Sequence, residues 1–75
     1  MQLLVTMPTG TTIAIRARAT DTIETVKDKI KEKEGIPSDH QQLTQASRHL
    51  ANEQTLRDYN ILTGATLHLA TTPAP

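Results

Sequence analysis

Residues 21–37 read DTIETVKDKIKEKEGIP, and this stretch decides the fold. Ile23, Val26 and Ile30 recur at spacings of three and four residues, which places them in one apolar stripe along a helix. Most positions between them are charged, as expected for the solvent-facing side of a surface helix. The spacing therefore predicts one amphipathic helix over residues 23–34.

Both ends of this helix carry boundary signals. Thr22 can accept a hydrogen bond from a free N–H group of the first turn, and Glu24 places a negative charge at the positive end of the helix dipole. Gly35 suits the left-handed position that follows a helix, and Pro37 cannot continue one. These residues set the expected start and end of the helix.

Two alternating segments precede the helix. In residues 1–6 and 11–17, side chains alternate between two faces with the period of two that is typical of half-buried strands. Pro8-Thr9-Gly10 lies between them and can form a turn, with Gly10 at positive φ. This arrangement predicts a β-hairpin.

The segments after the helix give weaker signals. Residues 41–45 and 49–50 are expected to form two short strands that pair through a turn at residues 46–47. Residues 55–59 suggest one helical turn, with Leu and Tyr side chains inward. Residues 66–70 alternate cleanly and predict a last strand.

The order of these elements indicates the fold class. A hairpin, one helix on one face of a mixed sheet, two short strands and a last strand together form an α+β roll. The last strand is expected to lie beside the first strand and parallel to it. Residues 71–75 read TTPAP and lack a large apolar side chain, so we expect a disordered tail or linker start after a domain of residues 1–70.

Composition limits the function classes. The chain has 75 residues, which is one small domain, and its core must be aliphatic because Phe, Trp and Cys are absent. Eight basic residues balance eight acidic ones, whereas nucleic-acid readers usually carry a basic surplus. No apolar run approaches the roughly 20 residues that span a bilayer. We expect a monomer in the cytoplasm, the nucleus or both, without nucleic-acid or membrane contacts, since a secretory segment is absent.

Titratable residues give no indication of a catalytic or metal site. His40, His49 and His68 lie on different segments, and no Cys or His-x-Glu motif accompanies them, so we interpret them as surface histidines. Asp39 next to His40 resembles an acid–base pair but has no nucleophile nearby. The lysines of residues 27–33 are typical of a solvated helix face. We therefore expect no enzyme activity, no metal and no cofactor.

Seven short pieces at fixed positions resemble the ubiquitin family. They are MQ at 1–2, TG at 9–10, DTIE at 21–24, KEGIP at 33–37, TL at 55–56, DYNI at 58–61 and TLHL at 66–69. The resemblance runs without a gap from Met1 to about Ala70. It implies the β-grasp fold, which agrees with the element order predicted from periodicity.

The resemblance also implies a protein-binding face. The family binds its main receptors through an apolar patch of four positions, which here carry Pro8, Thr44, His68 and Ala70. Only His68 is retained, while Pro, Thr and Ala replace Leu, Ile and Val. At about 25 cal/mol per Å² of buried apolar area, these losses could cost a few kcal/mol of binding free energy. The usual receptors are therefore expected to bind poorly unless a partner has adapted.

We define the sheet face as the surface that is expected to contact partner proteins. Its residues are Pro8, Thr44, Ser47, Arg48, His49, His68 and Ala70. The leading hypothesis is an N-terminal, non-catalytic module of a larger protein that docks to a ubiquitin receptor, a proteasome subunit or a regulatory enzyme through this face.

Two further features follow from the resemblance. The family attaches itself to targets through a basic tail that ends in two glycines, and residues 71–75 carry none, so conjugation through this terminus is not expected. Lys27, Lys29 and Lys33 match family lysines and are possible modification sites. Family members pair the first of these with an aspartate at the position of Asn52, so Lys27 should instead find Glu53 or lose hydration without compensation.

Two alternative hypotheses remain open. The chain could be a modifier whose precursor continues beyond residue 75, in which case a pair of glycines should follow within a few residues. It could also be a natural or engineered scaffold variant that keeps the fold and has lost the usual contacts.

Overall fold

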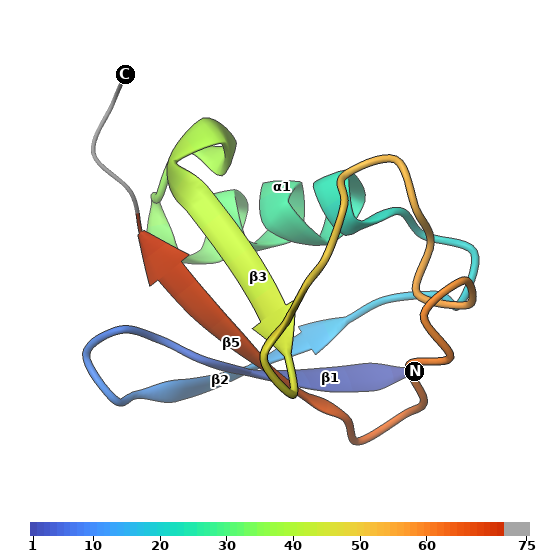
Figure 1. Cartoon of the computed structure of the whole chain (residues 1–75). Helices are drawn as coiled ribbons and strands as arrows, with labels where there is room; N and C mark the ends of the chain where they lie inside the picture. Colours follow the sequence, from blue (N-terminus) through green and yellow to red (C-terminus); the bar gives the residue numbers. More distant parts are fainter. Residues whose placement is uncertain (72–75) are drawn as a thin grey trace.

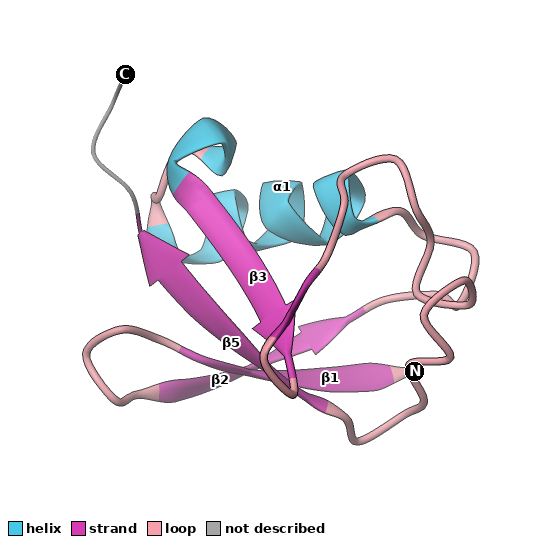
Figure 2. Ribbon diagram, in the orientation of Figure 1, coloured by secondary structure: helices cyan, strands magenta, loops and turns pink. Residues whose placement is uncertain are grey.

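A computed structural model describes residues 1–71 of the chain. Its elements are β1 (Gln2–Thr6), β2 (Thr12–Arg16), α1 (Ile23–Glu34), the 3₁₀ helix η1 (Ser38–His40), β3 (Gln41–Gln45), β4 (Arg48–His49) and β5 (Thr66–Thr71). The five strands form one sheet in the order β2-β1-β5-β3-β4. Helix α1 crosses one face of this sheet (Figures 1 and 2). The predicted α+β fold, with one main helix on a mixed sheet, is confirmed.

Strand β5 joins the two halves of the sheet. It pairs with β1 in parallel, with Thr6 opposite His68, and with β3 in antiparallel orientation, with Thr44 opposite the same His68. Strands β1 and β2 form the predicted antiparallel hairpin. The predicted position of the last strand beside the first is thus confirmed, and it brings the N-terminal and C-terminal strands together in the centre of the sheet.

Helix α1 begins and ends where the sequence predicts. The Oγ1 atom of Thr22 accepts a hydrogen bond from the N–H group of Thr25 at 3.2 Å, which caps the first turn. Gly35 lies in the left-handed region with φ 76° and donates its N–H to the carbonyl of Lys31. Positive side chains in the last turn complement the negative end of the helix dipole.

The core is aliphatic, as the composition requires. Its buried members come from the inner face of the sheet, from the stripe of α1 and from the loops that follow. They are Leu3, Val5, Met7, Ile15, Ala17, Ile23, Val26, Ile30, Leu43, Leu50, Leu56, Ile61, Leu67 and Leu69. Tyr59 packs against the edge of this cluster and is half-buried.

Three predicted boundaries differ in the structure. Thr55 forms an isolated bridge with Thr22, residues 56–59 form turns rather than a helical turn, and Asn60 follows with φ 57°. Strand β4 covers residues 48–49 instead of 49–50. Thr71, which was expected in the tail, extends β5 opposite Gln41, while residues 72–75 lie outside the described part of the chain.

The turn between β3 and β4 carries backbone strain. Ala46 and Ser47 adopt φ values of 51° and 66°, in the left-handed region that favours Gly and Asn. Two successive residues with positive φ form the hairpin turn that matches strand twist, but a Cβ atom at each position is sterically disfavoured. The fold therefore keeps a tight turn with residues that are poorly suited to it.

We predict that Ser47→Gly raises the free energy of unfolding by about 0.5–1 kcal/mol, because glycine adopts positive φ without the Cβ clash. Urea denaturation monitored by circular dichroism measures the change. Ser38→Gly is the matched control, since Ser38 begins η1 and glycine there should lower stability. Equal effects of both substitutions would contradict the strain at Ser47.

Candidate interaction surface

The outer side of the sheet, opposite α1, presents a row of polar side chains. Thr6 pairs with His68, His68 pairs with Thr44, and Thr44 pairs with His49 across four adjacent strands. Residues directly opposite one another project to the same side of a sheet. Neighbours such as Leu43 alternate with them and are buried beneath α1. Strand pairing therefore brings three residues of the predicted sheet face together.

A second row lies beside the first. Gln42 pairs with Ala70, and its Nε2 atom lies 2.9 Å from Nδ1 of His49. The two side chains are thus joined by a hydrogen bond on the exposed outer side of the sheet. Pro8 is exposed in the β1–β2 turn. Because β1 and β5 are parallel, this turn lies at the same end of the sheet as Ala70 (Figure 1).

Arg48 belongs to a fixed cluster at the edge of the sheet. Its guanidinium carbon lies 4.7 Å from the centroid of the Tyr59 ring, and its Nη2 atom donates to the Tyr59 carbonyl at 3.1 Å. The Tyr59 hydroxyl in turn accepts the N–H of Ala51 at 2.7 Å. A cation over an aromatic ring is held by electrostatic attraction. The Arg48 guanidinium is thus held against Tyr59. Ser47 is exposed beside it at the turn.

The surface formed by these rows is polar. Hydroxyl, imidazole, amide and guanidinium groups dominate it, so contacts to a partner would rely on hydrogen bonds. Among residues 1–71, Leu62 is the exposed large apolar residue, with 67% of its surface accessible to solvent. It lies in the loop before β5, at the opposite end of that strand from Ala70. Leu62 was not singled out from the sequence, and no pattern of alternation marks it, because it lies in a loop.

Lys27 is buried at 7% exposure, and its Nζ atom donates to Oδ1 of Asn52 at 2.7 Å. Desolvation by burial lowers the pKa of the Lys27 ammonium, and Glu24 counteracts this only in part. Of the two outcomes expected for Lys27, the pairing with Glu53 is not found, because Asn52 accepts the hydrogen bond of the ammonium, whereas the expected loss of hydration agrees with the lowered pKa. The ammonium therefore has a neutral acceptor where a carboxylate would stabilise it more.

The other two predicted modification lysines lie on the side of α1 that faces β2. The Nζ atom of Lys29 donates to the Arg16 carbonyl at 2.9 Å and lies 3.3 Å from Oδ2 of Asp21. The Nζ atom of Lys33 donates to the Ala14 carbonyl at 3.0 Å. Both ammonium groups thus contact the backbone of a strand.

Neither a metal centre nor a membrane segment was found in the described region. Residues 1–71 contain no group of three or more His, Cys, Asp or Glu side chains arranged to hold a metal ion. His49 and His68 flank Thr44 on the sheet face, whereas His40 lies in η1 with Asp39. The helices within this part of the chain are all too short or too polar to cross a membrane.

A sequence model of the ubiquitin family matches residues 3–74. The chain belongs to the ubiquitin family. This assignment confirms the resemblance found in the sequence and the β-grasp character of the fold.

Relatives of this ubiquitin-family chain differ in size. The NEDD8-like protein RUB3 of Arabidopsis thaliana is 42% identical over 69 residues, which cover 92% of the chain and 88% of the relative. The ubiquitin-like protein NEDD8 of Dictyostelium discoideum is 36% identical over 61 residues, 81% of the chain and 79% of the relative. The AN1-type zinc finger protein 4 of Mus musculus is 38% identical over 69 residues, but these make up only 9% of that protein.

We predict that Asn52→Asp raises the free energy of unfolding at pH 7 by about 1 kcal/mol, because a carboxylate would stabilise the buried Lys27 ammonium. Burial depresses the lysine pKa in the folded state, so the unfolded chain binds more protons between that pKa and 10.5. Stability of the parent should accordingly rise with pH in that window, and the rise should be smaller in the variant.

Chemical denaturation at neutral and alkaline pH measures both effects. Gln54→Glu is the matched control, since it adds the same charge two residues away on an exposed side chain. An equal gain in both variants would indicate a general charge effect and contradict a specific pairing with Lys27.

Proposed function

We propose that this chain is a non-catalytic ubiquitin-like domain that binds other proteins of the ubiquitin–proteasome machinery through the sheet face. The observation that supports this proposal is the row of exposed polar side chains opposite α1, formed by Thr44 with His49 and His68 on either side. Strand pairing fixes their backbone positions, so a partner meets a preorganised surface.

The chemistry of this face favours a partner rich in hydrogen-bond acceptors. The hydrogen bond between Gln42 and Nδ1 of His49 leaves the Nε2 atom of this exposed imidazole available to a partner. Arg48 is held over Tyr59 and adds a positive charge at the edge. Carboxylates or carbonyls on a ubiquitin receptor or proteasome subunit would match these groups better than the apolar surface that the family's usual patch contacts.

The relatives support two settings for such a domain. In the mouse zinc finger protein, the matching segment is a small part of a larger protein, which supports our proposal of a module attached to further domains. The Arabidopsis and Dictyostelium relatives are matched over most of their length and carry the names of NEDD8 or NEDD8-like proteins. They support the second candidate, a ubiquitin-like modifier.

The full reading frame distinguishes these two candidates. A pair of glycines within a few residues after Pro75 would favour the modifier, and a long second domain would favour the docking module. Sequencing the transcript past this position provides the observation.

We predict that titration of the ¹⁵N-labelled chain with proteasomal and ubiquitin-receptor domains shifts the amide signals of Thr44, His49 and His68. His68→Ala should weaken such binding about fivefold or more, because it removes a group at the centre of the face. His40→Ala is the matched control, since it removes an imidazole from η1, outside the residues of the sheet face. Absence of shifts at these three residues with every receptor tested would contradict the proposal.

A further inference from the structure

Strand β2 is an open edge of the sheet, since it pairs with β1 on one side only. The N–H of Ala17 donates to the Met1 carbonyl at 2.9 Å, and the N–H of Met7 donates to the Thr11 carbonyl at 2.7 Å. In an antiparallel pair, residues that exchange hydrogen bonds alternate with residues that do not. Odd-numbered residues of β2 therefore bond to β1, and even-numbered residues direct their N–H and C=O groups to the open edge.

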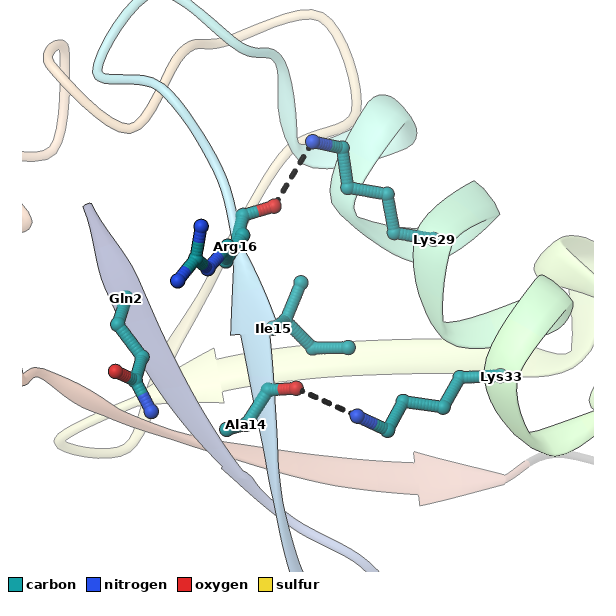
Figure 3. A pocket seen from close by; sticks show the side chains of 6 residues that line it. All are labelled: Gln2, Ala14, Ile15, Arg16, Lys29 and Lys33. Atoms are coloured by element: carbon teal, nitrogen blue, oxygen red, sulfur yellow. Dashed lines mark hydrogen bonds between the residues drawn. The ribbon is translucent and has the colours of Figure 1, made fainter.

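Two lysines of α1 occupy the carbonyls of this edge. Lys29 donates to the carbonyl of Arg16 and Lys33 to that of Ala14, as the dashed lines in Figure 3 mark. Such lysines protect an open edge from unwanted pairing with other strands. The N–H groups of Ala14 and Arg16 point to the same edge and offer two donors beside the two covered acceptors.

An open hollow of about 420 Å³ lies between the edge and the helix. Its lining residues are Gln2, Ala14, Ile15, Arg16, Lys29 and Lys33 (Figure 3). Three of these six carry a positive charge, and Asp21 balances one of them through its contact with Lys29. The hollow therefore combines strand hydrogen-bonding groups with a positive potential.

The spacing of the two lysines matches an extended chain. Four residues along a helix rise about 6 Å, and two residues along a strand rise about 6.7 Å. This match is why Lys29 and Lys33, four residues apart, reach the carbonyls of two residues that are two apart on β2. A strand laid against β2 would present every second side chain at the same interval.

We propose that the β2 edge binds an extended segment of a partner protein that carries acidic side chains at alternate positions. The segment adds a strand to β2: its N–H groups bond to the carbonyls of Ala14 and Arg16, and its carbonyls accept the N–H groups of these residues. Lys29 and Lys33 move from the carbonyls to the carboxylates of the segment. This site is separate from the sheet face and does not depend on the function proposed for it.

The exchange of partners explains the selectivity for acidic segments. Lys33 leaves a neutral carbonyl and gains a carboxylate, which forms the stronger, charge-assisted hydrogen bond, and Lys29 adds a second carboxylate to its contact with Asp21. A neutral strand would have to displace both lysines from their carbonyls without offering either of them a carboxylate in exchange. The two lysines thus close the edge to neutral strands and open it to strands with correctly spaced carboxylates.

The test uses the intact ¹⁵N-labelled chain and the synthetic peptide acetyl-TETETE-amide. Binding should shift the amide signals of Thr12, Ala14 and Arg16 and slow hydrogen exchange at the last two. Lys29→Gln/Lys33→Gln should weaken the affinity about tenfold or more. Lys31→Gln, on the exposed side of the same helix, removes one positive charge outside the hollow and should change the affinity less than about twofold, whereas Lys29→Gln or Lys33→Gln alone should weaken it more.

The block peptide acetyl-TTTEEE-amide has the same composition and charge but adjacent carboxylates, so it should bind more weakly to the unmodified chain. Equal binding of the two peptides would overturn the proposal, as would an equal loss of affinity in the Lys31→Gln variant. Shifts confined to the sheet face would overturn it as well, and this outcome would leave the function proposed for that face intact.

Discussion

The burial of the α1 stripe against the sheet is the interaction on which the rest of the structure depends. Ile23, Val26 and Ile30 are fully buried, and the core that they join contains aliphatic side chains only. In residues 1–71 the buried apolar side chains form one cluster and no group is arranged to hold a metal ion, and the sequence contains no cysteine, so the stability of the domain depends on this cluster. Helix caps and strand pairing serve to hold this stripe over the inner face of the sheet.

This arrangement separates stability from surface chemistry. Leu43 and Leu67 face α1. Thr44 and His68, the next residues along β3 and β5, lie on the outer side of the sheet. The period of two along a strand means that one set of side chains can change while the other stays. The ubiquitin-family fold is therefore compatible with an outer face that has lost most of its apolar character.

Local signals predicted the elements that depend on local causes. The helix, its caps and the hairpin follow from spacing and from residues such as Thr22 and Gly35, whose preferred backbone conformations are intrinsic. Thr44, His49 and His68 of the sheet face lie in one row because β3 pairs with β4 and β5, and the role of the whole face in binding stays a prediction. Hydrogen bonds between individual side chains, such as the one between Gln42 and His49, could not be predicted from the sequence.

Other features depend on contacts between distant segments. Sequence reasoning left Lys27 either to pair with Glu53 or to lose hydration, and it did not predict that the Asn52 side chain accepts the hydrogen bond of the ammonium. The clamp of Arg48 over Tyr59 joins a strand to a loop eleven residues away, and no spacing rule specifies it. These contacts are set by tertiary packing, which local patterns do not encode.

The most direct test of this account is equilibrium urea denaturation of two variants beside the parent chain. Ile30→Ala should lower the free energy of unfolding by about 3 kcal/mol, because it leaves a cavity under the helix. The triple variant Pro8→Leu/Thr44→Ile/Ala70→Val should stay within about 1 kcal/mol of the parent. A comparable loss in both would contradict the separation of core stability from the outer face.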